Sequence, residues 1–212
     1  MRNLTKSNSF FCKIKLKLVC LVIKHVIKQN NTVQYLNNTQ LSLKDRKILF
    51  LGMLEPTEGS CFVGNNNVAT DVARARKDLG LCPQHNILIK ELTVREHLQF
   101  FAEIKGLSRA EADSEIKTLG VEIQLGKKLD EKAVDLSGGM KRKLMLGIAL
   151  CGDSTKLILD EPSSGIDVRA RRELWSILEK YRKNKTMLLS THYMDEAEAL
   201  ADRIVIIGGK VT

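Results

Sequence analysis

The stretch that decides the fold is Leu157–Pro162, with the sequence LILDEP. Its first three residues form a continuous apolar run, which is typical of a strand buried on both faces of a parallel sheet. Asp160 and Glu161 follow the run directly. Ligands of α/β folds bind at the carboxyl edge of the sheet, so one carboxylate could hold Mg²⁺ and the next could orient or deprotonate a water. Taken alone, the pair fits a helix N-cap plus a solvated acid equally well.

The surrounding sequence alternates strands with helices. Further apolar runs occupy residues 187–189 and 204–207, and segments with helical spacing separate them. Capping boxes, in which two side chains satisfy free main-chain N–H groups at a helix start, are expected at Thr93–Glu96 and Ser108–Glu111. A further helix, capped by its first residue, is expected over Asp167–Lys183. The pattern predicts an α/β fold with a mostly parallel sheet.

The chain has 212 residues and a net charge of +9, but the charge is unevenly distributed. Residues 1–50 contain ten Lys and Arg and one acidic residue, whereas the rest of the chain is neutral. The charge therefore gives no reason to expect a nucleic-acid partner for the globular part. Residues 1–32 form a basic N-terminal arm of unknown role, where a peripheral strand region is favoured over a targeting signal or a membrane-surface segment.

Two classes of protein are disfavoured by the remaining composition. The five cysteines are odd in number and widely spaced, with no C-x-x-C pair, which argues against a disulfide framework or a zinc site. We expect them to be buried free thiols. The longest apolar run, residues 18–23, is far shorter than the ~18–20 residues that a membrane-spanning helix needs.

Three more segments carry polar groups in places where phosphate chemistry could use them. Leu136–Lys143, LSGGMKRK, opens a helix with a hydroxyl and two glycines, and free N–H groups at a helix start can bind phosphate. Ser190–His192 ends another apolar strand with a histidine, and Gln84 follows a short strand. Each of these signals is weak by itself, because capped helices, structural histidines and turn amides are common.

Together and in this order, the segments resemble the nucleotide-binding domain of ABC transporters, in wording closest to the lipid-exporter-like subfamily A. The resemblance covers about residues 33–212. The phrases that carry it are residues 81–86, 92–98, 137–144 and 190–197. The resemblance implies a P-loop NTPase-like fold with a mostly parallel core sheet, an N-terminal antiparallel β region and a helical signature subdomain at about residues 90–150.

The resemblance also implies roles for particular residues, with ATP and Mg²⁺ as the cofactors. The catalytic residues would be Glu161 and the switch histidine His192, and the metal ligands would be Asp160 and Gln84. The nucleotide-binding residues would be Gln84 of the Q-loop, Ser137, Gly138 and Gly139 of the signature, and Asp167 of the D-loop. The implied partners are a second nucleotide-binding domain and transmembrane domains outside this chain, which would hold it at the cytoplasmic side of a membrane.

One expected motif is missing. In this family a G-x-x-x-x-G-K-[ST] loop follows the first buried strand and binds the phosphates through its N–H groups, Lys and hydroxyl. Ile48–Gly52 matches that strand and the first glycine, and Met53–Ser60 then matches the segment after the loop's helix. The chain contains no Gly-Lys-Ser/Thr, so roughly twenty residues with the loop and its helix are missing. The fold is expected to be incomplete here and at its C-terminal end, where the return strand is absent.

Smaller departures concern the signature, the D-loop and the adenine contact. Met140 stands where the family usually has Gln, and Val168 stands where it usually has Pro. Tyr35 is the nearest candidate for the aromatic residue that stacks on adenine.

The missing loop decides the expected activity. Without it we expect poor ATP affinity and no ATP hydrolysis by the isolated chain. The resemblance favours an ATP-binding domain of a subfamily A-like transporter that moves lipids. Two alternatives remain open: a non-enzymatic remnant, truncated isoform or incomplete gene model, and a soluble ABC-type ATPase that acts on nucleic acid or the ribosome.

Overall fold

The computed structural model describes residues 19–23, 62–63 and 66–207. The strands are β1 Val19–Ile23, β2 Phe62–Val63, β3 Asn66–Asn67, β4 Leu79–Cys82, β5 Lys156–Asp160, β6 Thr186–Thr191 and β7 Ile204–Ile207. The helices are α2 Val72–Lys77, α3 Val94–Ile104, α4 Arg109–Glu122, α5 Gly138–Leu150, α6 Val168–Tyr181 and α7 Met194–Leu200, with short 3₁₀ turns η1 Gly126–Lys128 and η2 Ala133–Asp135.

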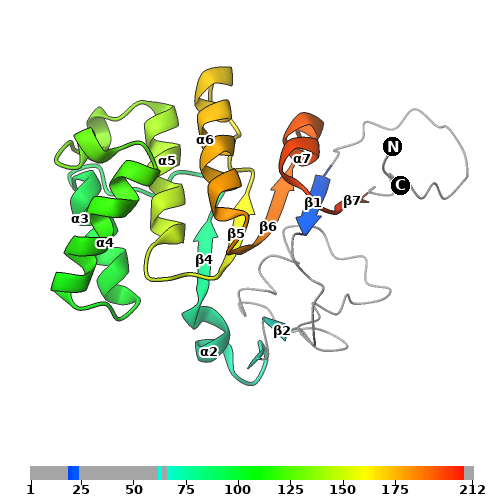
Figure 1. Ribbon diagram of the computed structural model, residues 1–212, viewed down its shortest axis with the longest axis horizontal. Coiled ribbons are helices and arrows are strands. Elements are labelled where there is room, and N and C mark those ends of the chain that lie inside the picture. The colour runs from blue at the N-terminus through cyan, green and yellow to red at the C-terminus, as the bar shows by residue number, and fades with distance from the viewer. Residues whose placement is uncertain (1–18, 24–61, 64–65, 208–212) are drawn as a thin grey trace, which may run out of the picture.

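A five-stranded sheet with the order β4-β5-β6-β1-β7 organises these elements. β4, β5 and β6 are parallel neighbours, as the apolar runs predict for β5 and β6, while β1 runs antiparallel to both β6 and β7. The helices α3, α4 and α5 lie together beside the β4 end of the sheet, and α6 and α7 lie nearer β5 and β6 (Figure 1). β2 and β3 form a separate antiparallel pair. The predicted α/β class, with an antiparallel β region and a helical part, is confirmed.

The strand β1 differs from the sequence prediction. A peripheral strand region was expected in the basic arm, whereas β1 occupies an interior position between β6 and β7. Cys20 is paired with Thr191 on one side and with Ile206 on the other. An apolar strand gains pairing partners on both sides in this position, which an edge strand cannot have. The predicted strand before Gly52 and the aromatic candidate Tyr35 lie outside the described residues.

The predicted helix starts are confirmed. Thr93 and Ser108 each accept the N–H of the residue three positions later, Glu96 and Glu111, and each of those carboxylates bonds back to the cap. These hydrogen bonds hold the pKa of Glu96 and of Glu111 below the ordinary value. α6 starts after Asp167 as expected and ends at Tyr181, two residues earlier than predicted.

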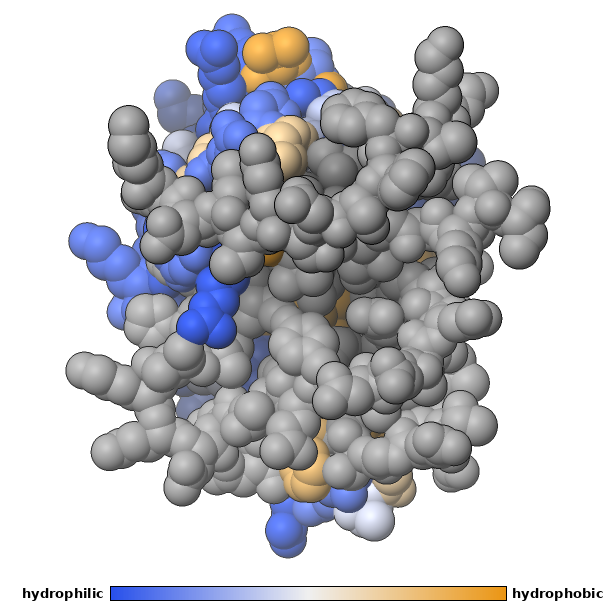
Figure 2. Space-filling model, turned by 90° about the vertical axis from the view of Figure 1, so that its right-hand side faces the viewer, coloured by the Kyte–Doolittle hydropathy of each residue, from blue (hydrophilic) through white to orange (hydrophobic). Residues whose placement is uncertain are grey.

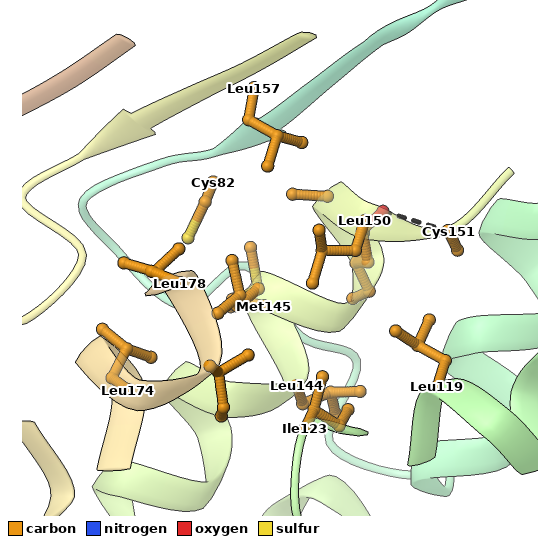
Figure 3. Packing of buried hydrophobic residues seen from close by; sticks show 14 of the residues in the cluster. Cys82, Leu119, Ile123, Leu144, Met145, Leu150, Cys151, Leu157, Leu174 and Leu178 are labelled. Carbon is orange, nitrogen blue, oxygen red and sulfur yellow. Dashed lines mark hydrogen bonds between the residues drawn. The ribbon is translucent and has the colours of Figure 1, made fainter. Parts of the chain in front are cut away.

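The core forms where α5 packs against the sheet and the other helices. Every residue of α5 from Arg142 to Leu150 is buried, and Figure 3 shows Leu144, Met145 and Leu150 of this helix among side chains of α4, α6, β4 and β5. Gly80 of β4 is required here, because a Cβ at this position would collide with the main-chain oxygen of Ala149. The sheet and the helix that begins at the signature are thus packed main chain to main chain.

Two of the five cysteines can be compared with the prediction. Cys82 and Cys151 are free and buried, as expected, and burial raises the pKa of each thiol to about 11. Within the described part of the chain, no helix is long and apolar enough to cross a membrane, and no cluster of three metal-ligating side chains occurs. In the view of Figure 2, those described residues that can be seen are mostly hydrophilic, with apolar side chains in a few separate groups.

Candidate functional site

The ends of β5 and β6 lie side by side at one edge of the sheet, because Asp160 is paired in parallel with Ser190. Glu161 follows the last residue of β5, and His192 follows the last residue of β6. His192 Nδ1 lies 2.6 Å from Glu161 Oε2. The two residues predicted to be catalytic are therefore hydrogen-bonded to each other, although they are far apart in the sequence.

Glu161 has an unusual main-chain conformation, with a φ of +48°. A left-handed conformation costs a residue other than glycine roughly 1–2 kcal/mol, so its surroundings must hold it. The Glu161 N–H donates to Ser190 O at 2.9 Å, and its carbonyl accepts the N–H of Ser164 at 3.0 Å. The Glu161 side chain is only 14% exposed, whereas that of His192 is 46% exposed. The carboxylate is fixed inside the edge, and the imidazole faces solvent.

The predicted metal ligands offer the right chemistry for Mg²⁺, which prefers oxygen ligands. Asp160 is half-buried, and its Oδ1 accepts a hydrogen bond of 2.9 Å from Ser190 Oγ. Gln84 is exposed just beyond β4, which is the neighbour of β5. The carboxylate of Asp160 and the amide oxygen of Gln84 could thus contribute to one cation site at this edge.

Arg142 connects these segments and was not singled out from the sequence. Its guanidinium donates to the main-chain oxygens of Asp160, Glu161 and Pro162 at 2.8, 2.9 and 2.5 Å. It also donates to the oxygens of Pro83 and Gln84, at 2.5 and 3.2 Å. The side chain is 1% exposed. The loop with Gln84 and the loop with Glu161 therefore meet at one residue of α5.

The start of α5 keeps its first turn open to solvent. Ser137 and Gly138 are exposed, and Ser137 Oγ accepts the N–H of Met140 at 3.3 Å. The N–H groups of Gly138 and Gly139 lie in the first turn, where no acceptor inside the helix is available. A Cβ added at Gly138 would meet nothing within 4 Å. An anion could therefore approach this helix start closely, as the predicted phosphate contact requires.

The start of α6 packs against the start of α5. Asp167 caps α6 by accepting the N–H of Ala170 at 2.9 Å, and this bond holds the pKa of Asp167 below its ordinary value. A Cβ at Gly139 would lie 2.7 Å from the Cβ of Ala170. The glycine is thus needed for the contact between the two helix starts, and Asp167 has a structural role in addition to the predicted nucleotide contact.

Two further contacts support the imidazole from behind. The Tyr193 ring lies 4.0 Å from that of His192, and the guanidinium carbon of Arg171 lies 3.9 Å from the centre of the Tyr193 ring.

Glu196 is fully buried and accepts a hydrogen bond of 3.0 Å from Trp175 Nε1. Burial, with the charge of Glu161 nearby, raises the pKa of the Glu196 carboxyl.

These supporting residues carry weak signals in the sequence. Arg142 stands between Lys141 and Lys143, before the apolar run of α5, and its carbonyl acceptors leave no trace in the sequence. Glu196 reads as one of several surface acids of a short helix. Tyr193 follows the histidine directly, and its stacking depends on Arg171, which comes from another helix.

Comparison with known proteins decides the family. A family model described as ABC transporter matches residues 48–164, which is more than half of the chain. The chain belongs to the ABC transporter family. The resemblance inferred from the motifs is confirmed. This chain is an ATP-binding domain of the family, and its relatives include several subfamily A proteins.

Relatives of this chain include two human phospholipid-transporting ATPases. It is 44% identical to human retinal-specific phospholipid-transporting ATPase ABCA4 over 84% of the chain, and 46% identical to human phospholipid-transporting ATPase ABCA3 over 75%. These matches span only 8% and 9% of the relatives. A solved structure titled "Structure of ATP binding subunit of ABC transporter" superposes with a TM-score of 0.68 at 26% identity, covering 87% of this chain and 83% of that one.

Proposed function

We propose that this chain is the ATP-binding part of a subfamily A-type lipid transporter. Its signature, which begins at Ser137, would contact ATP that is held by a partner domain. The observation that carries this proposal is the open start of α5, with Ser137 and Gly138 exposed. The phospholipid-transporting names of ABCA4 and ABCA3 support the lipid substrate class. The paired-domain arrangement comes from the family resemblance.

The edge with Glu161 and His192 would serve the chain's own nucleotide. The Glu161 carboxylate lies 2.6 Å from His192 Nδ1 and can orient a water, while the imidazole faces the solvent side where a terminal phosphate would lie. Asp160 and Gln84 would hold Mg²⁺, which supplies positive charge to neutralise the phosphates. These residues form the hydrolytic half of an ATP site.

The phosphate-binding half of that site is what the sequence lacks. A phosphate loop must follow a strand that ends at the edge of Asp160 and Thr191. The neighbour of β6 on the side away from β5 is β1. The register of this pair places Cys20, near the beginning of β1, next to Thr191 at the end of β6. β1 therefore runs away from this edge. Together with the absence of Gly-Lys-Ser/Thr from the chain, this direction supports weak ATP binding and no hydrolysis by the chain alone.

The transmembrane partners would contact the surface made by α3 and the segment before it. Ile87 and Ile89 are 71% and 52% exposed, and Phe100 and Ile104 on α3 are 50% and 63% exposed. The Ile89 N–H donates to His97 Nε2 at 3.0 Å, which joins the segment to the helix. Exposed apolar side chains favour a protein partner. Through it the chain would lie at the cytoplasmic side of a membrane, and no nucleic-acid partner is proposed.

A complementation assay tests this function. The full chain is mixed with the ATP-binding domain of ABCA3 whose own signature serine is replaced by Arg, so that only mixed pairs have a complete site. ATP turnover is expected to appear when the chain is added and to stay absent with the Ser137→Arg chain. Equal turnover with both chains, or none with either, would contradict the proposal.

The second candidate is a non-enzymatic remnant, and the observation that favours it is the missing phosphate loop. Transcripts read across the Gly52–Met53 junction distinguish an incomplete gene model from a true deletion. If they contain the loop, the chain's own site is complete and the prediction of inactivity no longer applies. Tight, salt-sensitive binding of RNA or DNA by the purified chain would instead favour the third alternative, a soluble ATPase that acts on nucleic acid or the ribosome.

A further inference from the structure

The guanidinium of Arg142 is buried in the first half of α5. Its five hydrogen bonds all go to main-chain carbonyl oxygens, and they match the five N–H donors of an arginine. Burial of a charge is costly unless polar groups surround it, so these carbonyls and the guanidinium depend on one another. The neighbouring base Lys143 differs, since its Nζ contacts the side chains of Gln124 and Glu173 at 2.9 and 2.5 Å.

Three of the five acceptors are consecutive. The carbonyls of residues 160–162 turn toward one guanidinium, and the middle one belongs to Glu161, whose φ is +48°. Consecutive carbonyls of an extended strand point to opposite sides, so their convergence requires the chain to bend here. The remaining main-chain bonds of Glu161, to Ser190 and Ser164, fix the ends of this bend. Arg142 is the group that fills its centre.

We propose that Arg142 is a positioning residue that holds Glu161 in its left-handed conformation and thereby aims its carboxylate at His192. The same side chain binds Pro83 and Gln84, so it locks the loop after β4 to the loop after β5. Arg142 lies in α5, one turn beyond Gly138, and a displacement of the helix start is transmitted to the Glu161–His192 pair. This last consequence rests on the proposed function, whereas the positioning role does not.

Hydrogen exchange of the full chain, followed by mass spectrometry without nucleotide, tests the positioning role. In Arg142→Lys, a point charge with three donors replaces the planar group. Exchange is expected to rise about tenfold or more in both residues 83–88 and residues 160–164. Lys143→Met is the matched control, because it removes a buried base from the same helix. It should leave both loops within about threefold of wild type. Equal loosening by the two variants, or no loosening by Arg142→Lys, would overturn the proposal.

A double-mutant cycle separates positioning from packing. Glycine adopts a left-handed conformation freely, so Glu161→Gly should remove most of the need for Arg142 at this turn. Exchange of residues 160–164 in the Arg142→Lys, Glu161→Gly double variant is expected within about threefold of Glu161→Gly alone. An undiminished tenfold effect in the glycine background would mean that Arg142 only packs, and the proposal would fail.

The wild-type chain provides a test that needs no variant, in case Arg142→Lys does not fold. Since one guanidinium locks the two loops, residues 83–88 and 160–164 should exchange through a common opening at low denaturant. Separate openings would overturn the proposal. None of these measurements involves ATP or a partner domain, so their failure would leave the complementation assay unaffected, and failure of that assay would leave them standing.

Discussion

The start of α5 and the edge formed by the ends of β5 and β6 are the two regions where this chain could meet phosphate. The first is assembled locally: Ser137 caps the helix, Gly138 leaves space, and Gly139 packs on α6. The second draws on β4, β5 and β6, and in the family it also needs a phosphate loop that this sequence lacks. A locally assembled site survives the loss of a distant segment, whereas a site gathered from several strands does not.

Restoring the loop should produce the largest effect. Insertion of a phosphate loop and its helix between Gly52 and Met53 is expected to raise ATP affinity by about 100-fold or more, because the loop supplies N–H donors and a Lys charge. Isothermal titration of the full chain measures the change. The control is the same insertion with Ala in place of the loop's Lys. Equal ATP affinities with and without the insertion would show that the weak ATP binding has another cause.

The two glycines of α5 distinguish space for a ligand from space needed for packing. Gly139→Ala is expected to lower the free energy of unfolding by about 1–3 kcal/mol, because its Cβ meets that of Ala170. Gly138→Ala, the matched control in open space, should be neutral or stabilising by up to about 1 kcal/mol. Urea unfolding measures both. The reverse order would mean that the starts of α5 and α6 do not pack as described.

The edge stores strain at Glu161, which a comparison of two truncations can measure. Glu161→Gly and Glu161→Ala both remove the contact with His192, but only Gly relieves the left-handed main chain. We expect the Gly variant to be more stable than the Ala variant by about 1 kcal/mol. The difference in urea midpoint tests this. Equal stability of the two variants would argue against a strained turn.

The smallest effect concerns the buried acid behind the edge. Because the pKa of Glu196 is raised in the folded chain, the folded state binds this proton more tightly than the unfolded state does. The stability that the neutral carboxyl contributes is present at low pH and is lost as pH rises through the raised pKa. Glu196→Gln should therefore gain stability relative to wild type as pH rises above the ordinary range of a carboxyl pKa. Thermal unfolding at several pH values checks this, and a parallel pH profile would contradict it.

The sequence predicted the parts of the fold that depend on local patterns. The capping boxes at Thr93 and Ser108 were predictable because side chain and main chain interact within one turn. The apolar runs predicted β5 and β6 because strands covered on both faces carry few polar residues, and a further run predicted β7. The interior position of β1 was not predictable, since pairing with β6 and β7 depends on partners 165 to 188 residues away.

The candidate site likewise combines features that the sequence predicts with features that depend on the folded structure. The approach of His192 to Glu161 followed from two strands ending at one edge, which parallel topology imposes. The left-handed turn at Glu161 and the Arg142 guanidinium inside it were not predictable from the sequence, because a main-chain carbonyl accepts a hydrogen bond whatever its residue type. Arg142 could be recognised only when the fold brought five carbonyls around it.

We propose that this chain carries the residues expected for hydrolysis but lacks the phosphate loop needed to use them on its own ATP. Phosphate release by the full chain alone, at saturating Mg²⁺ and ATP, is to be compared between wild type and Glu161→Gln. We expect the same background rate for both proteins. A wild-type turnover that Glu161→Gln abolishes would contradict it.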